Sequence, residues 1–233
     1  MITFFTVPKP WRGHIMLIQD MALCNWNALP CNKQVLTYET GVKTTTQGTP
    51  LLDDVFARAS EKADYDVMMY SNADMLYMPS LVEVIKKVSG CFTKFLMVGQ
   101  RTDVPSFILD FRKPDWDIYL KMKAQIRGTL HPPSGIDYFV FKRDMVSEIQ
   151  MLPFAVGRPA WDNWLIARCL ELGYPVVDAT KHILAMHQNH DFSHLRRGRW
   201  ESRHGIEAQE NRRLAGDKLA TIENATHRLE DLL

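Results

Sequence analysis

The chain has 233 residues, of which 46% are hydrophobic and 24% charged, and a formal net charge of +1. These values are typical of one substantial globular domain, and the near-neutral charge excludes a global electrostatic attraction to nucleic acid or membranes. No apolar run reaches the roughly 18 residues of a transmembrane helix, and the N-terminal residues lack the charged region of a signal peptide. The four cysteines are scattered without a C-x-x-C pair. We therefore expect free thiols and a cytoplasmic protein.

The first part of the chain alternates between short apolar runs and segments of helical periodicity. Apolar, β-rich runs at residues 2–7, 35–38, 66–70 and 95–98 predict four strands. Apolar residues recurring at intervals of three and four positions predict helices at residues 14–27, 51–59 and 79–88. This β-α-β-α-β-α-β order indicates an α/β domain with a mostly parallel central sheet flanked by helices.

The regularity breaks after Gly99. Residues 100–134 are rich in Asp, Arg, Lys and Pro, and they include the run His131-Pro132-Pro133-Ser134, which cannot form regular sheet. Residues 135–142 predict a further strand, residues 161–172 a helix, and residues 176–177 and 183–186 two short strands. The tail from Arg196 is basic and polar and then becomes apolar at helical spacing around residues 214–229. We divide the chain into a catalytic domain, residues 1–195, and a basic, then helical, C-terminal extension packed on it, residues 196–233.

A carboxylate follows the third predicted strand, in the segment Ser71-Asn72-Ala73-Asp74. Open α/β sheets bind ligands at the carboxyl ends of their parallel strands. A carboxylate at that edge can hold a divalent cation, and the cation can hold a diphosphate. The structural alternative is that an apolar strand simply ends in Asn or Asp, which is common.

An aspartate lies between two tryptophans in Trp161-Asp162-Asn163-Trp164, where a loop enters a helix. In the structural interpretation, Asp162 is a first-turn residue that favours the helix dipole. In the functional one, Asp162 is a catalytic base beside aromatic rings that stack on a sugar.

Three histidines fall within eight residues in the segment that begins at His187, directly after a predicted strand. The segment is either a solvated polar loop or a metal site. His187, His190 and His194 have the spacing of one helical face, which would suit zinc, but the residues between them are poor helix formers. A single His187 that shares a cation with Asp74 fits the pattern better.

Four arginines surround Trp200 in residues 196–203. The stretch is either a solvated surface segment or a clamp for a diphosphate, because the guanidinium fork matches phosphate oxygens.

Together these segments resemble the GT-A glycosyltransferases, and more closely a little-characterised bacterial and viral group of them. The resemblance rests on the strand end at Asp74 and on the runs GIDYFVF, GRPAWDNWL, HQNHDFSH and NATHRL, in that order. It covers nearly the whole chain, with residues 100–130 supporting it least.

The resemblance implies a GT-A-like fold and a role for each matching residue. Asp74 and His187 would hold Mn²⁺ or Mg²⁺, and Asp162 would deprotonate the acceptor hydroxyl. The implied donor-binding residues are Thr6, Pro8, Trp11, Glu39, Asn72, Asp74, Arg196 and Arg199. The implied acceptor- or sugar-binding residues are Trp161, Trp164, Asp137 and His190. Because Asn72 replaces the first Asp of the DxD motif, the dependence on metal is open.

The resulting hypothesis is a metal-assisted, inverting transfer of a sugar from a UDP- or GDP-linked donor to the hydroxyl of an unknown glycan, lipid, protein or nucleic-acid acceptor. Two other classes stay open. One is a non-catalytic module of the same fold that binds a nucleotide or carbohydrate, and the other is a His-rich metallohydrolase.

Overall fold

The structure, a computed structural model, describes residues 1–191 and 197–232. Its regular elements, α-helices, strands and two 3₁₀ turns (η), are β1 (Ile2–Thr6), α1 (Gly13–Ala28), β2 (Lys33–Thr37), α2 (Leu52–Lys62), β3 (Val67–Ser71), β4 (Met75–Tyr77), α3 (Ser80–Cys91), β5 (Leu96–Val98), β6 (Arg101–Pro105), α4 (Trp116–Arg127), β7 (Thr129–Leu130), β8 (Tyr138–Lys142), α5 (Met145–Ile149), α6 (Trp161–Glu171), β9 (Val176–Asp178), β10 (Ala185–Asn189), α7 (Gly198–His204), α8 (Ile206–Ala215), η1 (Ile222–Asn224), β11 (His227–Arg228) and η2 (Leu229–Leu232).

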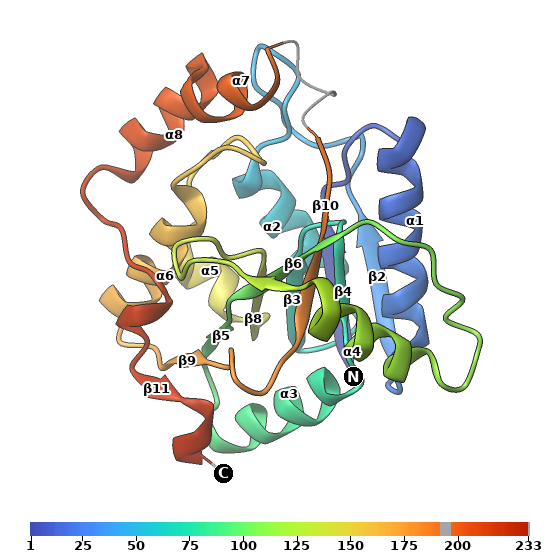
Figure 1. Cartoon of the computed structure of the whole chain (residues 1–233). Helices are drawn as coiled ribbons and strands as arrows, with labels where there is room; N and C mark the ends of the chain where they lie inside the picture. The colour runs from blue at the N-terminus through green and yellow to red at the C-terminus, as the bar shows by residue number, and fades with distance from the viewer. Residues whose placement is uncertain (192–196, 233) are drawn as a thin grey trace.

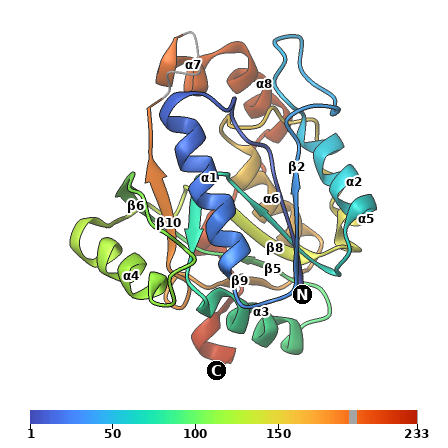
Figure 2. The ribbon, with the colours of Figure 1, turned by 90° about the vertical axis from the view of Figure 1, so that its right-hand side faces the viewer.

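Seven of the described strands form a central sheet in the order β11-β9-β5-β8-β3-β1-β2. Neighbours run parallel except at β8, which is antiparallel to both β3 and β5. Helices cover both faces, with α1 on one side of the strands and α2 and α5 on the other (Figures 1 and 2). The prediction of an α/β domain with a mostly parallel central sheet flanked by helices is confirmed.

The core has two halves, one on each face of the sheet, because alternate strand residues point in opposite directions. In β1, Phe4 stacks on Trp26 of α1, whereas Phe5 meets the edge of Phe56 in α2. Gly99 is needed where the chain leaves β5 beside β8, since a Cβ there would lie 2.2 Å from the hydroxyl oxygen of Tyr138.

A second, four-stranded sheet has the order β4-β10-β6-β7. Two of its strands and α4 lie within residues 100–134, where the sequence predicted no regular element. Residues 131–134 form no strand, as expected. β6 is stabilised by pairing with β10 along all five of its residues. Its polar residues obscured the strand in the sequence. The last strand also lies later in the chain than the sequence predicted, because β10 begins at Ala185 and includes His187.

The helix expected around residues 214–229 is not formed, because α7 and α8 lie in the basic stretch before it and α8 ends at Ala215. After Gly216 the chain forms two 3₁₀ turns and β11, which pairs in parallel with β9 at the edge of the central sheet. Within the described residues, we find no helix of the length and apolar character that crossing a bilayer requires.

Candidate functional site

Four polar side chains meet where β1 ends and β4 and β10 lie side by side. The Oδ2 atom of Asp74 is 2.7 Å from Nζ of Lys9, 3.1 Å from Nε2 of His190 and 3.8 Å from Nε2 of His187. Nζ of Lys9 also lies 2.9 Å from Nε2 of His190. One atom each from Asp74, His187 and His190 can be chosen so that all lie within 4.8 Å of one another, a spacing that could hold a metal ion. Asp74 and His187, 113 positions apart in the chain, thus lie together as the sequence suggested.

The backbone around Asp74 is held by buried amide side chains. Asp74 lies in the turn between β3 and β4, and Asn25 of α1 fixes β4 by donating to the Tyr77 carbonyl and accepting from the Tyr77 N–H. The backbone N–H of Gln188 in β10 donates to the Asp74 carbonyl at 3.1 Å. Because both neighbours are buried and hydrogen-bonded, the carboxylate is placed by the fold and not by a mobile loop.

Lys9 is positioned by an equally specific contact. The side chain of Gln19, buried on α1, accepts from the Lys9 N–H at 2.6 Å and donates to the Lys9 carbonyl at 3.0 Å. The loop after β1 is therefore anchored at the residue whose ammonium group contacts Asp74.

A second aspartate orients His187. Asp103 of β6 contacts Nδ1 of His187 at 2.9 Å with one oxygen and Nδ1 of His131 at 2.7 Å with the other. If Nδ1 of His187 carries the proton for this hydrogen bond, Nε2 presents a lone pair toward Asp74. A carboxylate behind a histidine in this way is the usual support for a metal-ligating imidazole.

The charges of the cluster shift the pKa values of its members. Burial alone would raise the pKa of Asp74, but the positive charge of Lys9 and the two neighbouring histidines outweigh it and hold that pKa well below its usual range. Burial would lower the pKa of His187, yet Asp74 and Asp103 outweigh burial and raise it. The carboxylate therefore stays ionised at neutral pH and is available to a cation.

The chemistry of the donor atoms fits a divalent cation. Among the described residues, Oδ1 of Asp74 is buried and has no hydrogen-bond partner. A buried carboxylate oxygen without a partner is costly unless a ligand satisfies it. Imidazole nitrogen suits Zn²⁺ and carboxylate oxygen suits Mg²⁺ or Mn²⁺, so the mixed set of donor atoms is compatible with each of these ions.

Asn72 and Asp137 are joined to each other instead of to this cluster. The Asn72 amide donates to Oδ1 of Asp137 at 2.5 Å, and Arg101 forms an ion pair with the same carboxylate. Asp137 is 6% exposed. Since its oxygens are taken up by Asn72 and Arg101, the structure favours a role in positioning the turn before Asp74 over direct contact with a sugar.

Asp162 is the second residue of α6, as expected from the sequence. Although its side chain retains some exposure, burial of the carboxyl and the nearby charge of Asp137 together raise its pKa to about 7, against the opposing effect of backbone N–H groups. Burial raises the pKa of the Tyr70 hydroxyl, and the charges of Asp137, Asp74 and Asp162 raise it further.

The two tryptophans beside Asp162 belong to the core. Trp161 is 4% exposed and packs edge-on against Tyr70, and Trp164 is 5% exposed and packs against Phe154. Their buried rings offer no free face on which a sugar could stack. The expectation that Trp161 and Trp164 bind the sugar is therefore corrected, and the aromatic pair is explained by packing.

The remaining predicted residues fall into three groups. Thr6 is buried at the end of β1 with an Oγ1 atom that no described residue hydrogen-bonds, and Pro8 and Trp11 lie partly exposed in the loop that carries Lys9. Glu39 and Arg199 are exposed, Glu39 after β2 and Arg199 in α7. Arg196 and His194 lie outside the described residues, so the site proposed for three histidines is described only at His187 and His190. His187 lies in strand β10, so it does not share a helical face with His190.

Sequence reasoning missed Lys9 and Asp103. Lys9 stands between two prolines directly after a strand, a position at the same sheet edge as Asp74. Asp103 lies in a region expected to be irregular, and only the pairing of β6 with β10 brings it opposite His187.

No family model matches the chain, and no curated protein matches it in sequence. Among solved structures, the chain is similar to the inositol-1-phosphate CTP transferase from T. maritima, with 10% identity, a TM-score of 0.40, and coverage of 94% of this chain and 97% of that one. It is also similar to residues 1–349 of S. aureus TarS, with 10% identity and a TM-score of 0.40 over 81% of this chain and 57% of that one. Likenesses at this level carry no functional conclusion, so the function rests on the side chains described above.

Proposed function

We propose that this protein is a glycosyltransferase that moves a sugar from a nucleoside-diphosphate sugar to an acceptor hydroxyl. The observation that carries the proposal is the buried Asp74 carboxylate, which has two imidazoles beside it and one oxygen that no described residue hydrogen-bonds, at the edge of a mostly parallel sheet. Ligands of open α/β sheets bind at this edge. The resemblance of the surrounding motifs to GT-A enzymes points the same way.

Asp74, His187 and His190 would hold the divalent cation, Mn²⁺ or Mg²⁺. When bound, the cation would neutralise the charge that develops on the leaving diphosphate. Lys9, 2.7 Å from Asp74, is a protein cation at the same place and can contact phosphate oxygens. The loop from Thr6 to Trp11 and the exposed Glu39 would bind the nucleoside.

Asp162 would act as the general base. A base works best when its pKa lies near the working pH, and the pKa of Asp162 is raised to about 7. Deprotonation of the acceptor opposite the leaving group corresponds to displacement with inversion.

The free thiols of the described chain agree with a cytoplasmic location.

One observation favours a second candidate. Two imidazoles and one carboxylate form the ligand set of several hydrolytic zinc sites, which keep a fourth position open for water. A metallohydrolase would purify with stoichiometric zinc and would not need a nucleotide. A non-catalytic nucleotide-binding module would bind the donor without releasing nucleoside diphosphate.

The test is release of UDP or GDP from a panel of nucleotide sugars in the presence of Mn²⁺, Mg²⁺ or a chelator. We expect cation-dependent release by the wild-type protein and none by Asp74→Ala. Asp66→Ala is the matched control, because Asp66 precedes the same strand β3 at its other end and has an exposed side chain. Equal release by Asp74→Ala and Asp66→Ala would overturn the assignment. Binding without release would favour the non-catalytic module.

A further inference from the structure

Helix α4 presents an apolar face to solvent. Its inner side is anchored by the buried residues Trp116 and Leu120. On its outer side, four large apolar residues are between 47% and 72% exposed: Ile118, Tyr119, Met122 and Ile126. The helix lies at the edge of the molecule, away from the main helical layers (Figure 2). Isolated exposed apolar residues are ordinary, but four on one short helix form a continuous stripe.

The order of residues around α4 makes the helix amphipathic. At about 100° per residue, the four apolar side chains fall within an arc of roughly 100°. Gln125 and then Lys121 follow on one side of this arc, and Lys123 and then Arg127 follow on the other. An apolar stripe bordered by lysines and arginines is the pattern of helices that lie in the plane of an anionic membrane surface.

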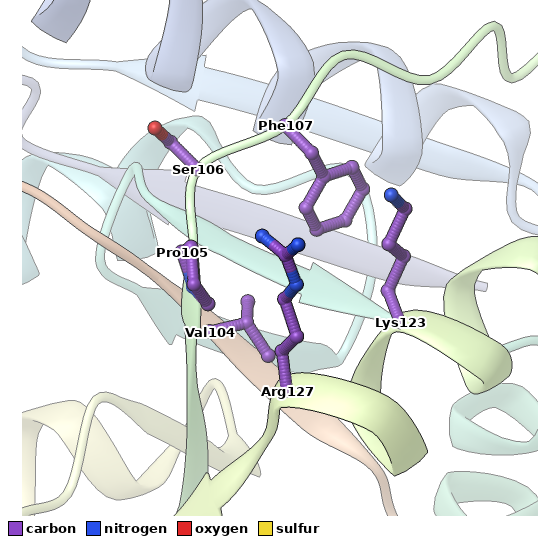
Figure 3. A pocket seen from close by; sticks show the side chains of 6 residues that line it. All are labelled: Val104, Pro105, Ser106, Phe107, Lys123 and Arg127. Atoms are coloured by element: carbon purple, nitrogen blue, oxygen red, sulfur yellow. The ribbon is translucent and has the colours of Figure 1, made fainter.

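A small pocket lies beside the basic border. It is lined by Val104 to Phe107 and by the side chains of Lys123 and Arg127, which stand next to the ring of Phe107 (Figure 3). Nζ of Lys123 is 5.7 Å from the centroid of that ring. Among the described residues, neither Lys123 nor Arg127 forms a salt bridge. Two cations without a carboxylate partner, facing one pocket, match the chemistry of a phosphate group.

We propose that α4 and this pocket form a docking surface for a bilayer that contains anionic phospholipid. The stripe enters the boundary between headgroups and acyl chains, and Lys123 and Arg127 contact a lipid phosphate. Ile108, which is 81% exposed and follows Phe107 in the pocket wall, adds a further apolar contact.

The charges and size of the surface favour a membrane over a second copy of the chain. A symmetric pair of copies would bring the basic borders of two α4 helices together, and like charges repel. Four side chains on a 12-residue helix also cover far less than the roughly 1,000 Å² that a stable protein interface needs. A bilayer imposes no such minimum, and reversible binding is expected from one short helix.

The test is sedimentation of the full chain with vesicles of phosphatidylcholine alone and of phosphatidylcholine mixed with phosphatidylserine. We expect binding to the anionic vesicles that weakens with added salt, and weaker binding to the neutral ones. Ile126→Asp should lower the partition coefficient at least about tenfold, because one apolar side chain is lost from the contact and a negative charge is gained. Lys123→Gln with Arg127→Gln should remove the preference for anionic lipid.

Ile206→Asp is the matched control. Ile206 is 73% exposed, as Ile126 is 72% exposed, but it lies in α8. Melting temperatures of both variants establish that the fold is intact, which is expected for exposed positions. Equal loss of binding in the two variants, or no sedimentation of the wild type with anionic vesicles, would overturn the proposal. So would a dimer in solution that Ile126→Asp dissociates. The readout does not depend on enzymatic activity, so this test and that of the proposed function fail separately.

Discussion

Replacing Asp162 by asparagine should stabilise the protein at pH 8 while abolishing transfer. The surrounding protein raises the pKa of Asp162 to about 7 from an ordinary value of 3.8. Because the folded-state pKa lies above that of the unfolded chain, the protonated carboxyl favours folding. That contribution is complete below about pH 4 and is lost as the pH rises through about 7.

The magnitude follows from the same values. The difference between 3.8 and about 7 corresponds to ~4 kcal/mol in the free energy of unfolding, lost between low pH and pH 8. Asparagine has the same shape and stays neutral, but it accepts hydrogen bonds from backbone N–H groups less well than a carboxylate does. This difference reduces the gain in the free energy of unfolding by about 1 kcal/mol or more. We therefore expect Asp162→Asn to gain roughly 2 kcal/mol at pH 8, or about 4–8 °C in Tm for a chain of this size.

The assay is thermal unfolding of both proteins at pH 8 and near pH 4.5, together with the transfer rate at pH 8. The gain in Tm should be present at pH 8 and absent or reversed near pH 4.5, and turnover should fall by about 10²–10⁴. Asp117→Asn is the matched control, because Asp117 follows Trp116 at the start of α4 as Asp162 follows Trp161 at the start of α6. A Tm difference that is the same at both pH values, or a normal transfer rate, would refute the reasoning.

Two further substitutions test the cluster around Asp74. Lys9→Met should bind Mn²⁺ roughly ten- to thirtyfold more tightly in calorimetric titrations. The reason is that a single and a double positive charge about 4 Å apart repel by ~2 kcal/mol even with the screening of bulk water. Unchanged affinity would mean that the ammonium group does not compete with the ion. Asp103→Asn should weaken Mn²⁺ binding about 10- to 100-fold without unfolding the protein, because His187 loses the carboxylate that orients its ring; an equal Mn²⁺ affinity would remove Asp103 from the site.

The sequence predicted most strands of the central sheet, though not β11, because burial there leaves a clear local pattern. β1, β3 and β8 are short apolar runs, and α2 repeats Leu52, Val55, Phe56 and Ala59 on one face. These signals are local, so they can be read without knowing what each element contacts. The carboxylate of Asp74 followed from the same rule, since it comes directly after a buried strand.

The second sheet could not be predicted, because β6 and β7 depend on pairing with distant strands. Arg101 and Asp103 are polar, and the residues of β6 do not alternate between polar and apolar in the way that would mark a strand. Only contact with β10, more than eighty positions later, brings Asp103 opposite His187. Trp161 and Trp164 were assigned to sugar binding because the sequence shows aromatic residues next to a carboxylate. It does not show that their rings are buried.

Calorimetric titration of UDP and GDP in the presence of Mn²⁺ tests the central claim most directly, with the wild-type protein compared with Asp74→Asn. Asparagine keeps the shape of the side chain while removing the charge that Lys9, His187 and His190 surround. We predict nucleotide binding that requires Mn²⁺ in the wild type and is lost in Asp74→Asn, with both proteins folded by circular dichroism. Cation-dependent nucleotide binding of equal affinity in the two proteins would contradict the assignment of Asp74 as the metal ligand.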